Sequence, residues 1–100
     1  MGRCVRCGAV GTVQRDHRQN RMRGNTVASN LQALCPRCHQ FKSEHPMLAT
    51  EEGWSVPRWG VPSSWPAQRM VCGPHGLHLV WVLYDDLGGC ARSTRPRRDG

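Results

Sequence analysis

The chain has 100 residues, a hydrophobic fraction of 38% and a formal net charge of +7. This length fits one small domain, which buries too little apolar surface to be stable without a metal ion, disulfide bonds or a partner. The charge suits a polyanionic partner such as nucleic acid, and it lies mostly in residues 1–50, which hold eight Arg and Lys against two acids.

The pattern of apolar residues argues against a membrane span. The longest apolar run, residues 77–84, is interrupted by His78 and is far too short to cross a bilayer. Because the chain opens MGRCVRCG, with no basic leader followed by an apolar run, we expect a cytoplasmic protein rather than a secreted one. Its six cysteines are then expected to stay reduced and to bind metal.

The first third of the chain predicts a tight turn, a strand and a loop. Residues 1–8 are expected to turn around a metal, since Gly8 follows two closely spaced cysteines. Residues 9–16 favour a short β-strand, and the basic stretch that follows has no apolar face and is expected to be a loop. The apolar pattern resumes at residues 29–34, as either a strand or one helical turn.

Two helices are predicted next. Residues 36–44 form the first, because Pro36 suits a first helical position, where its missing N–H would have no partner. The His45-Pro46 pair ends this helix. A second short helix is expected from Met47 and stops at Gly53.

The second half of the chain predicts little regular helix. Residues 55–69 carry three prolines, with tryptophans between and beside them, and are expected to be irregular but ordered. We expect these tryptophans to fill a small core rather than to stack on bases. Residues 79–84 and 90–92 predict a β-hairpin around a five-residue turn, and residues 93–100 a basic flexible tail.

Two Cys-x-x-Cys pairs, Cys4/Cys7 and Cys35/Cys38, predict a structural zinc site. Four thiolates in two such pairs match tetrahedral zinc, and the two-residue spacer lets both sulfurs of a pair face one ion. The bound ion would stabilise the thin core and tie the start of the chain to the first helix. Because a closed four-thiolate shell leaves no position for a substrate, catalysis needs other residues.

Four further polar residues fit the hydrolysis of a phosphodiester. That reaction needs a base to activate water, a cation to hold the phosphate oxygens and a group to orient the base. His17 is the candidate base, and Asn30 is expected to orient its ring through the side-chain carbonyl. Asp16 and His39 are the candidate ligands of a hard or borderline divalent ion.

The stretch from Cys4 to Lys42 resembles the HNH endonuclease family, whose ββα-metal motif runs between two Cys-x-x-Cys pairs in many members. The resemblance implies a small metal-stapled α+β domain with a ββα-metal, treble-clef-like core, to which this chain adds a C-terminal β-hairpin. It places His17 on the general base, Asn30 on the central Asn, and Asp16 and His39 on the metal ligands. It also implies cleavage or nicking of DNA, with structural Zn²⁺ and catalytic Mg²⁺ or Mn²⁺.

Three parts of one domain are therefore expected. Residues 1–46 form the HNH nuclease core with its zinc site, residues 47–92 a helix, a Trp- and Pro-rich segment and a hairpin packed on that core, and residues 93–100 the tail. The segment after residue 46 resembles small HNH proteins of bacteriophages. This implies a place in the host-cell cytoplasm and phage DNA-packaging proteins as candidate partners.

Basic residues near the predicted site are expected to contact phosphates. They are Arg18, Arg21, Arg23 and Lys42. Two alternatives stay open. A treble-clef-like zinc domain could bind nucleic acid without cutting it. A second zinc site could also form from Cys72, His75, His78 and Cys90, although Gly73-Pro74 is explained more simply as a turn.

Overall fold

The computed structural model describes residues 2–96, in which strands and short helices form the small α+β fold that the sequence predicts. No helix within residues 2–96 has the length and apolar character needed to span a membrane. In chain order the elements are β1 (Gly2–Arg3), β2 (Val10–Gly11), β3 (Gln14–His17), the 3₁₀ helix η1 (Ala28–Asn30), β4 (Leu31–Leu34), α1 (Pro36–Glu44), α2 (Pro46–Glu51), the 3₁₀ helix η2 (Pro62–Ser64), β5 (Ala67–Gly73), β6 (Gly76–Tyr84) and β7 (Cys90–Arg92).

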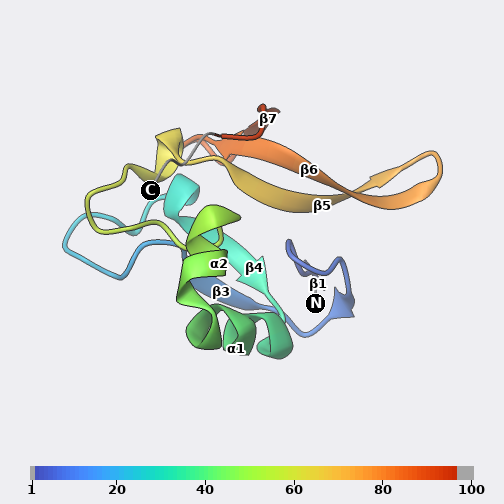
Figure 1. Cartoon of the computed structure of the whole chain (residues 1–100), viewed down its shortest axis with the longest axis horizontal. Coiled ribbons are helices and arrows are strands. Elements are labelled where there is room, and N and C mark those ends of the chain that lie inside the picture. Colours follow the sequence, from blue (N-terminus) through green and yellow to red (C-terminus); the bar gives the residue numbers. More distant parts are fainter. Residues whose placement is uncertain (1, 97–100) are drawn as a thin grey trace.

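A ββα unit made by β3, β4 and α1 forms the first half of the fold. β3 and β4 pair antiparallel, with Asp16 opposite Gln32, and Figure 1 shows α1 on one side of this pair. The helix has the predicted bounds. Pro36 lies in its first turn, and the His45 N–H closes its last turn on the Phe41 carbonyl.

The turn between β1 and β2 carries the first two cysteines and packs on the ββα unit. Gly8 has a φ of 78°, a conformation that glycine adopts without strain. The Val5 N–H donates to the Ala33 carbonyl of β4 at 3.0 Å, which fixes the turn beside that strand. The core formed there buries Cys4, Val5, Leu34, Cys38 and Trp54.

The C-terminal hairpin is present, and it is part of a larger sheet than predicted. β6 and β7 pair antiparallel, with Tyr84 opposite Cys90. The five-residue turn between them is held by the Asp85 carboxylate, whose Oδ1 accepts the Leu87 and Gly89 N–H groups at 2.8 Å each. This confirms the predicted turn.

β5 is the main difference from the sequence prediction, which made residues 55–69 irregular. It pairs with β6 along its whole length, from Ala67 opposite Val82 to Gly73 opposite Gly76. Its sequence, AQRMVCG, holds a single β-branched residue, so its own strand propensity is weak. The strand forms because β6 supplies a hydrogen-bonding partner. The expected turn at Gly73-Pro74 is confirmed as the connection between the two strands.

Only some of the tryptophans fill the core as expected. Trp54 is 4% exposed and joins the core of the ββα unit. Trp59 is 80% exposed, so its assignment to the core was wrong. Its ring packs edge-to-face on Trp65, with 5.4 Å between ring centroids.

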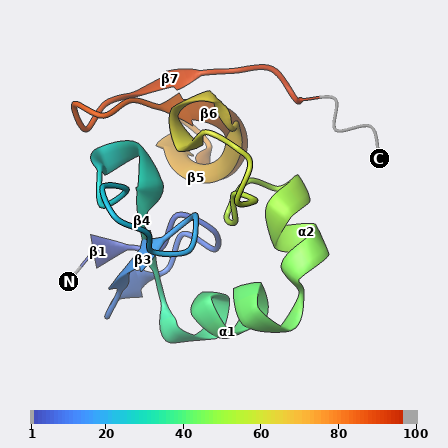
Figure 2. The same cartoon turned by 90° about the vertical axis from the view of Figure 1, so that its left-hand side faces the viewer.

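Hydrogen bonds join β5 to the β1–β2 turn and to the segment after α2, both of which pack on the ββα unit. The Met70 N–H of β5 donates to the Val5 carbonyl at 2.8 Å, and Trp54 Nε1 donates to the Gln68 carbonyl at 2.9 Å. Figures 1 and 2 show the β5–β6 hairpin and α1 on opposite sides of the β3–β4 pair. Of the predicted tail, residues 93–96 follow β7 without regular secondary structure, and residues 97–100 lie outside the described part of the chain.

Candidate active site and zinc cluster

Four cysteines from two separate segments converge on one point. The Sγ atoms of Cys4, Cys7, Cys35 and Cys38 all lie within 4.8 Å of one another. Zinc–sulfur bonds of about 2.3 Å in a tetrahedron separate the sulfurs by about 3.8 Å, and the Cys7 and Cys35 sulfurs are 3.8 Å apart. The cluster therefore fits the structural zinc site that the sequence predicts.

The surroundings of the cluster affect the ionisation of its thiols. Burial raises the pKa of Cys38 to about 12, although Arg6 Nη1 opposes this shift by donating to the Cys38 sulfur at 3.4 Å. Burial also raises the pKa of Cys7. For Cys4 burial acts in the same direction, but hydrogen bonds from backbone N–H groups outweigh it and lower the pKa to about 7. The metal-free cluster thus holds protons that a zinc ion would displace.

The structure gives no support to a second zinc site in the hairpin. Cys72 lies opposite Leu77, near the turn between β5 and β6, whereas Cys90 lies opposite Tyr84 at the other end of β6. Seven residues along a strand span about 23 Å. Within residues 2–96, the four clustered cysteines are the only group of three or more His, Cys, Asp and Glu residues close enough to share an ion.

Asp16 and His39 meet between the end of β3 and the first turns of α1. Asp16 Oδ1 lies 3.4 Å from His39 Nε2. The other carboxylate oxygen of Asp16, Oδ2, accepts hydrogen bonds from Lys42 Nζ at 2.7 Å and from Gln32 Nε2 at 2.9 Å. One oxygen is thus held by protein donors, and the other faces the imidazole. The two residues predicted as metal ligands are brought together.

His17 follows Asp16 in β3, and its ring makes a hydrogen bond that the sequence analysis did not foresee. The sequence prediction pairs the His17 ring with the side chain of Asn30. In the structure His17 Nε2 lies 3.2 Å from the Thr26 hydroxyl oxygen, in the loop between β3 and β4. No motif marked Thr26, because its place beside His17 depends on the path of that loop.

Asn30 is buried and holds the loop rather than the His17 ring. Its side-chain oxygen accepts the Gln19 N–H at 2.7 Å, and its amide donates to the carbonyls of Gln19 at 3.2 Å and Asn25 at 2.9 Å. With 0% of its surface exposed, Asn30 is closed off from solvent. The predicted contact with His17 is therefore corrected: the buried amide satisfies backbone groups that would otherwise be unpaired.

Arg18, which the sequence predicts as a phosphate contact, is instead buried inside the fold. It is 1% exposed, and its guanidinium donates to backbone carbonyls of four residues. These are Gly53 at 3.0 Å, Ser29 at 2.8 Å, Pro62 at 3.0 Å and Trp65 at 2.6 Å. Arg18 therefore joins the loop after β3 to the segment that follows α2.

Lys42, also predicted as a phosphate contact, is 16% exposed and points inward. Its Nζ donates to the Asp16 carboxylate at 2.7 Å and to the His17 carbonyl at 2.6 Å. Two of its three N–H donors are thus used to fix the end of β3 against α1. The remaining two predicted contacts, Arg21 and Arg23, are exposed in the loop between β3 and β4.

A protein-family model described as HNH endonuclease matches residues 4–45. Residues 4–45 therefore match an HNH endonuclease domain. The match contains the four clustered cysteines together with Asp16, His17, Asn30 and His39. No curated protein and no solved structure gives a significant match to the chain. The family is one of nucleases, so the match implies a nuclease-type function for residues 4–45.

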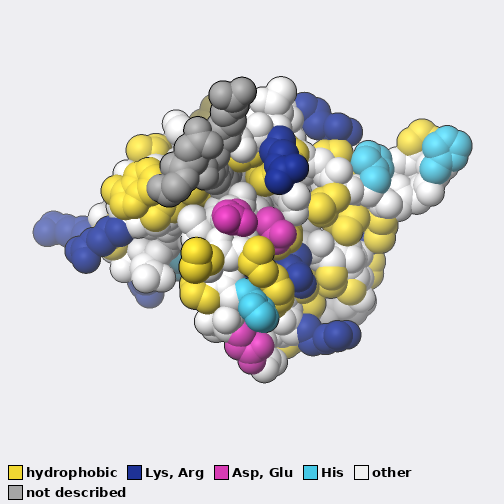
Figure 3. Space-filling model, viewed as in Figure 1, with side chains coloured by type: hydrophobic (Ala, Val, Ile, Leu, Met, Phe, Trp, Pro, Cys, Tyr) yellow, Lys and Arg dark blue, Asp and Glu magenta, His cyan; other side chains and the backbone are white. Residues whose placement is uncertain are grey.

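The HNH domain shares a pocket with the segment that follows it. The pocket has a volume of about 670 Å³, and Asp16, His17 and His39 are among the residues that line it. Four arginines line it as well: the buried Arg18 and the exposed Arg15, Arg21 and Arg58. Arg58 lies after α2, outside the family match, and no sequence signal connected it with the site. Acidic side chains, in contrast, lie over the helices α1 and α2, as Figure 3 shows.

Proposed function

We propose that this chain is a divalent-metal-dependent endonuclease that hydrolyses phosphodiester bonds in DNA. The observation that supports this best is the meeting of Asp16 and His39 at 3.4 Å, with His17 adjacent to Asp16, in a pocket bordered by arginines. A carboxylate and an imidazole can share one ion, and a neighbouring imidazole can serve as base.

Asp16 and His39 fit a catalytic Mg²⁺ or Mn²⁺. Two donors bound to one ion at about 2.1 Å lie about 3.0–3.4 Å apart when their bonds make an angle of 90–110°, which agrees with the 3.4 Å between Asp16 Oδ1 and His39 Nε2. Mg²⁺ usually keeps several waters and takes few protein ligands, so two suffice. Such an ion would draw charge from the phosphate oxygens.

His17 is the proposed general base. With Nε2–H donating to the Thr26 hydroxyl, Nδ1 keeps a lone pair that can accept a proton from an attacking water. Lys42 holds the His17 carbonyl at 2.6 Å, which fixes the backbone that carries the ring. In this proposal Thr26 orients the His17 ring and Lys42 fixes its backbone. Asn30 holds the loop between β3 and β4.

DNA is the proposed substrate because the pocket is open and bordered by guanidinium groups. Arg15, Arg21 and Arg58 are exposed residues that line it. Arginine donates two parallel hydrogen bonds to a phosphate, which suits a backbone rather than a base. A bacteriophage origin, and phage DNA-packaging proteins as partners, stay predictions from the sequence pattern after residue 46.

The test is cleavage of supercoiled plasmid by the zinc-loaded protein with Mg²⁺, with Mn²⁺ or with neither. We expect metal-dependent cutting, and a loss of about 10²–10⁴-fold in rate for His17→Ala, since a general base contributes that much. The matched control is His75→Ala, because His75 is exposed in the turn between β5 and β6. This variant should cut at the native rate.

Two results would contradict the proposal. A folded His17→Ala protein that cuts at the native rate would remove His17 as the base. Plasmid that shifts in a gel but stays intact with every metal would favour the alternative, a treble-clef-like zinc domain that binds nucleic acid without cutting it.

A further inference from the structure

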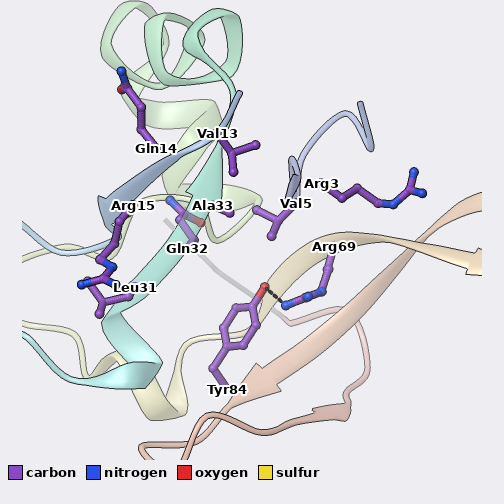
Figure 4. Close-up of a pocket in the computed structure, with 10 residues that line it drawn as sticks. All are labelled: Arg3, Val5, Val13, Gln14, Arg15, Leu31, Gln32, Ala33, Arg69 and Tyr84. Carbon is purple, nitrogen blue, oxygen red and sulfur yellow. Dashed lines mark hydrogen bonds between the residues drawn. The ribbon is translucent and has the colours of Figure 1, made fainter. Parts of the chain in front are cut away.

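A second cavity lies on the side of the β3–β4 pair that faces away from α1, between this pair and the β5–β6 hairpin. Its volume is about 370 Å³. Figure 4 shows Arg15 and Leu31 on the side of β3–β4, and Arg69 and Tyr84 on the side of the hairpin. Arg3 lines it too, and none of its ten lining residues is acidic. We refer to this cavity as the hairpin groove.

The strand register connects the hairpin groove with the candidate active site. Residues paired across two antiparallel strands point to the same face of a sheet. Arg15, Ala33 and Leu31 therefore lie on the face toward the hairpin, whereas Asp16 points to the side of α1. His17, the last residue of β3, lines the candidate active-site pocket together with Asp16. Arg15 lines both cavities.

The polar groups of the hairpin groove are suited to an anion. Arg69 Nη1 lies 3.5 Å from the Tyr84 hydroxyl oxygen, and its guanidinium carbon lies 5.7 Å from the centroid of the Tyr84 ring. When that oxygen accepts from Arg69, the hydroxyl proton can be donated to a ligand. Within residues 2–96 the Arg15 side chain has no hydrogen bond or ion pair to another residue, so its guanidinium can bind a ligand.

The walls between these polar groups are apolar, with Val5, Val13 and Leu31 among the lining residues. A phosphodiester segment matches this combination, because its phosphates need guanidinium groups while its sugars and bases need apolar contact. A small inorganic anion would use only the arginines. Continuity with the active site through Arg15 favours the longer ligand.

We propose that the hairpin groove is a second phosphodiester-binding site, which holds the DNA strand beyond the phosphate that is cut. This inference rests on the proposed nuclease function. It gives the part of the chain outside the HNH match a role in binding substrate: Arg69 and Tyr84 retain the strand, while the reacting groups stay in the HNH domain.

The experiment measures the binding of fluorescent single-stranded and duplex oligonucleotides to zinc-loaded full-length protein carrying His17→Ala, without added Mg²⁺. Arg69→Gln in this background should weaken binding of a 12-mer by about 3- to 10-fold at low salt and leave binding of a trinucleotide unchanged. The slope of log affinity against log salt should fall by about 0.7–0.9, the value for one lost phosphate contact. Tyr84→Phe, which keeps the ring, should weaken 12-mer binding by about 2- to 3-fold.

The matched control is Arg92→Gln, because Arg92 is exposed on β7 of the same sheet and lines neither cavity. It should change neither the affinity nor the salt slope.

The proposal is overturned if folded Arg69→Gln binds the 12-mer with the affinity and slope of its parent. It is also overturned if Arg69→Gln abolishes binding of inorganic phosphate and leaves 12-mer binding intact, since that result shows a small-anion site. Because only binding is measured here, a wild-type protein that fails to cut would refute the nuclease function but leave the hairpin groove as a phosphodiester-binding site.

Discussion

Replacing Arg18 tests the conclusion that this residue stabilises the fold instead of contacting DNA. Arg18 donates four hydrogen bonds of 2.6–3.0 Å to backbone carbonyls, and it is 1% exposed. Arg18→Met keeps an apolar stem of similar length and removes every donor. Because its acceptors lie in residues 29, 53, 62 and 65, the substitution loosens the contact between the HNH domain and the following segment.

The size of the effect follows from the number of bonds. One intramolecular hydrogen bond contributes about 1 kcal/mol net, so losing four of them should lower the free energy of unfolding by about 4 kcal/mol. Small domains are stable by about 5–15 kcal/mol in total. For a domain of this size, a loss of about 4 kcal/mol corresponds to a fall in Tm of about 15–30 °C.

The assay is denaturant unfolding of zinc-loaded protein at one fixed zinc concentration, followed by tryptophan fluorescence. Arg21→Met is the matched control, because Arg21 is exposed in the same loop and lines the active-site pocket. It should shift stability by less than about 0.5 kcal/mol and weaken DNA binding. The reasoning is refuted if Arg18→Met is as stable as the native protein and loses DNA affinity as Arg21→Met does.

Two further predictions concern the zinc cluster and the turn after α2. Because burial raises the pKa of Cys38 to about 12, zinc must displace its proton, and zinc affinity should therefore rise from pH 6 to pH 8. Calorimetry in two buffers of different ionisation heat measures the released protons, and a pH-independent affinity would contradict the assignment. Gly53→Ala should cost more than about 2 kcal/mol, since φ is 86° and the new methyl group would collide with Pro66 and Ala67. Gly24→Ala, with φ of 82° but open space around it, should cost about 1 kcal/mol; equal losses in a denaturant titration would argue against the collision.

Local signals explain why the HNH half of the chain was predicted well. The Cys-x-x-Cys spacing determines which sulfurs can face one ion, and the four cysteines do converge within 4.8 Å. Pro36 and the His45-Pro46 pair act through their own backbone, so the bounds of α1 were correct. The order Asp16, His17 and His39 was likewise enough to predict that Asp16 and His39 would meet.

The errors arose where a residue depends on segments far away in the sequence. Arg18 and Arg21 stand in the same basic stretch, yet only Arg18 is buried, because carbonyls of residues 53, 62 and 65 come to surround it. β5 has weak strand propensity and forms through its pairing with β6. Arg58 reaches the pocket lined by Asp16, His17 and His39 only because the segment after α2 returns to residues 4–45.

The sequence by itself therefore determined the four-cysteine cluster, the HNH match over residues 4–45 and the polar residue types of the candidate site, since ligand spacing and helix termini are local properties. The tertiary structure alone decided how those residues are used. It placed Thr26 rather than Asn30 on the His17 ring, turned Arg18 and Lys42 inward, and opened a basic groove between β3–β4 and the hairpin. The physical reason is that a buried donor must find its acceptors, and here those acceptors come from segments that only folding brings together.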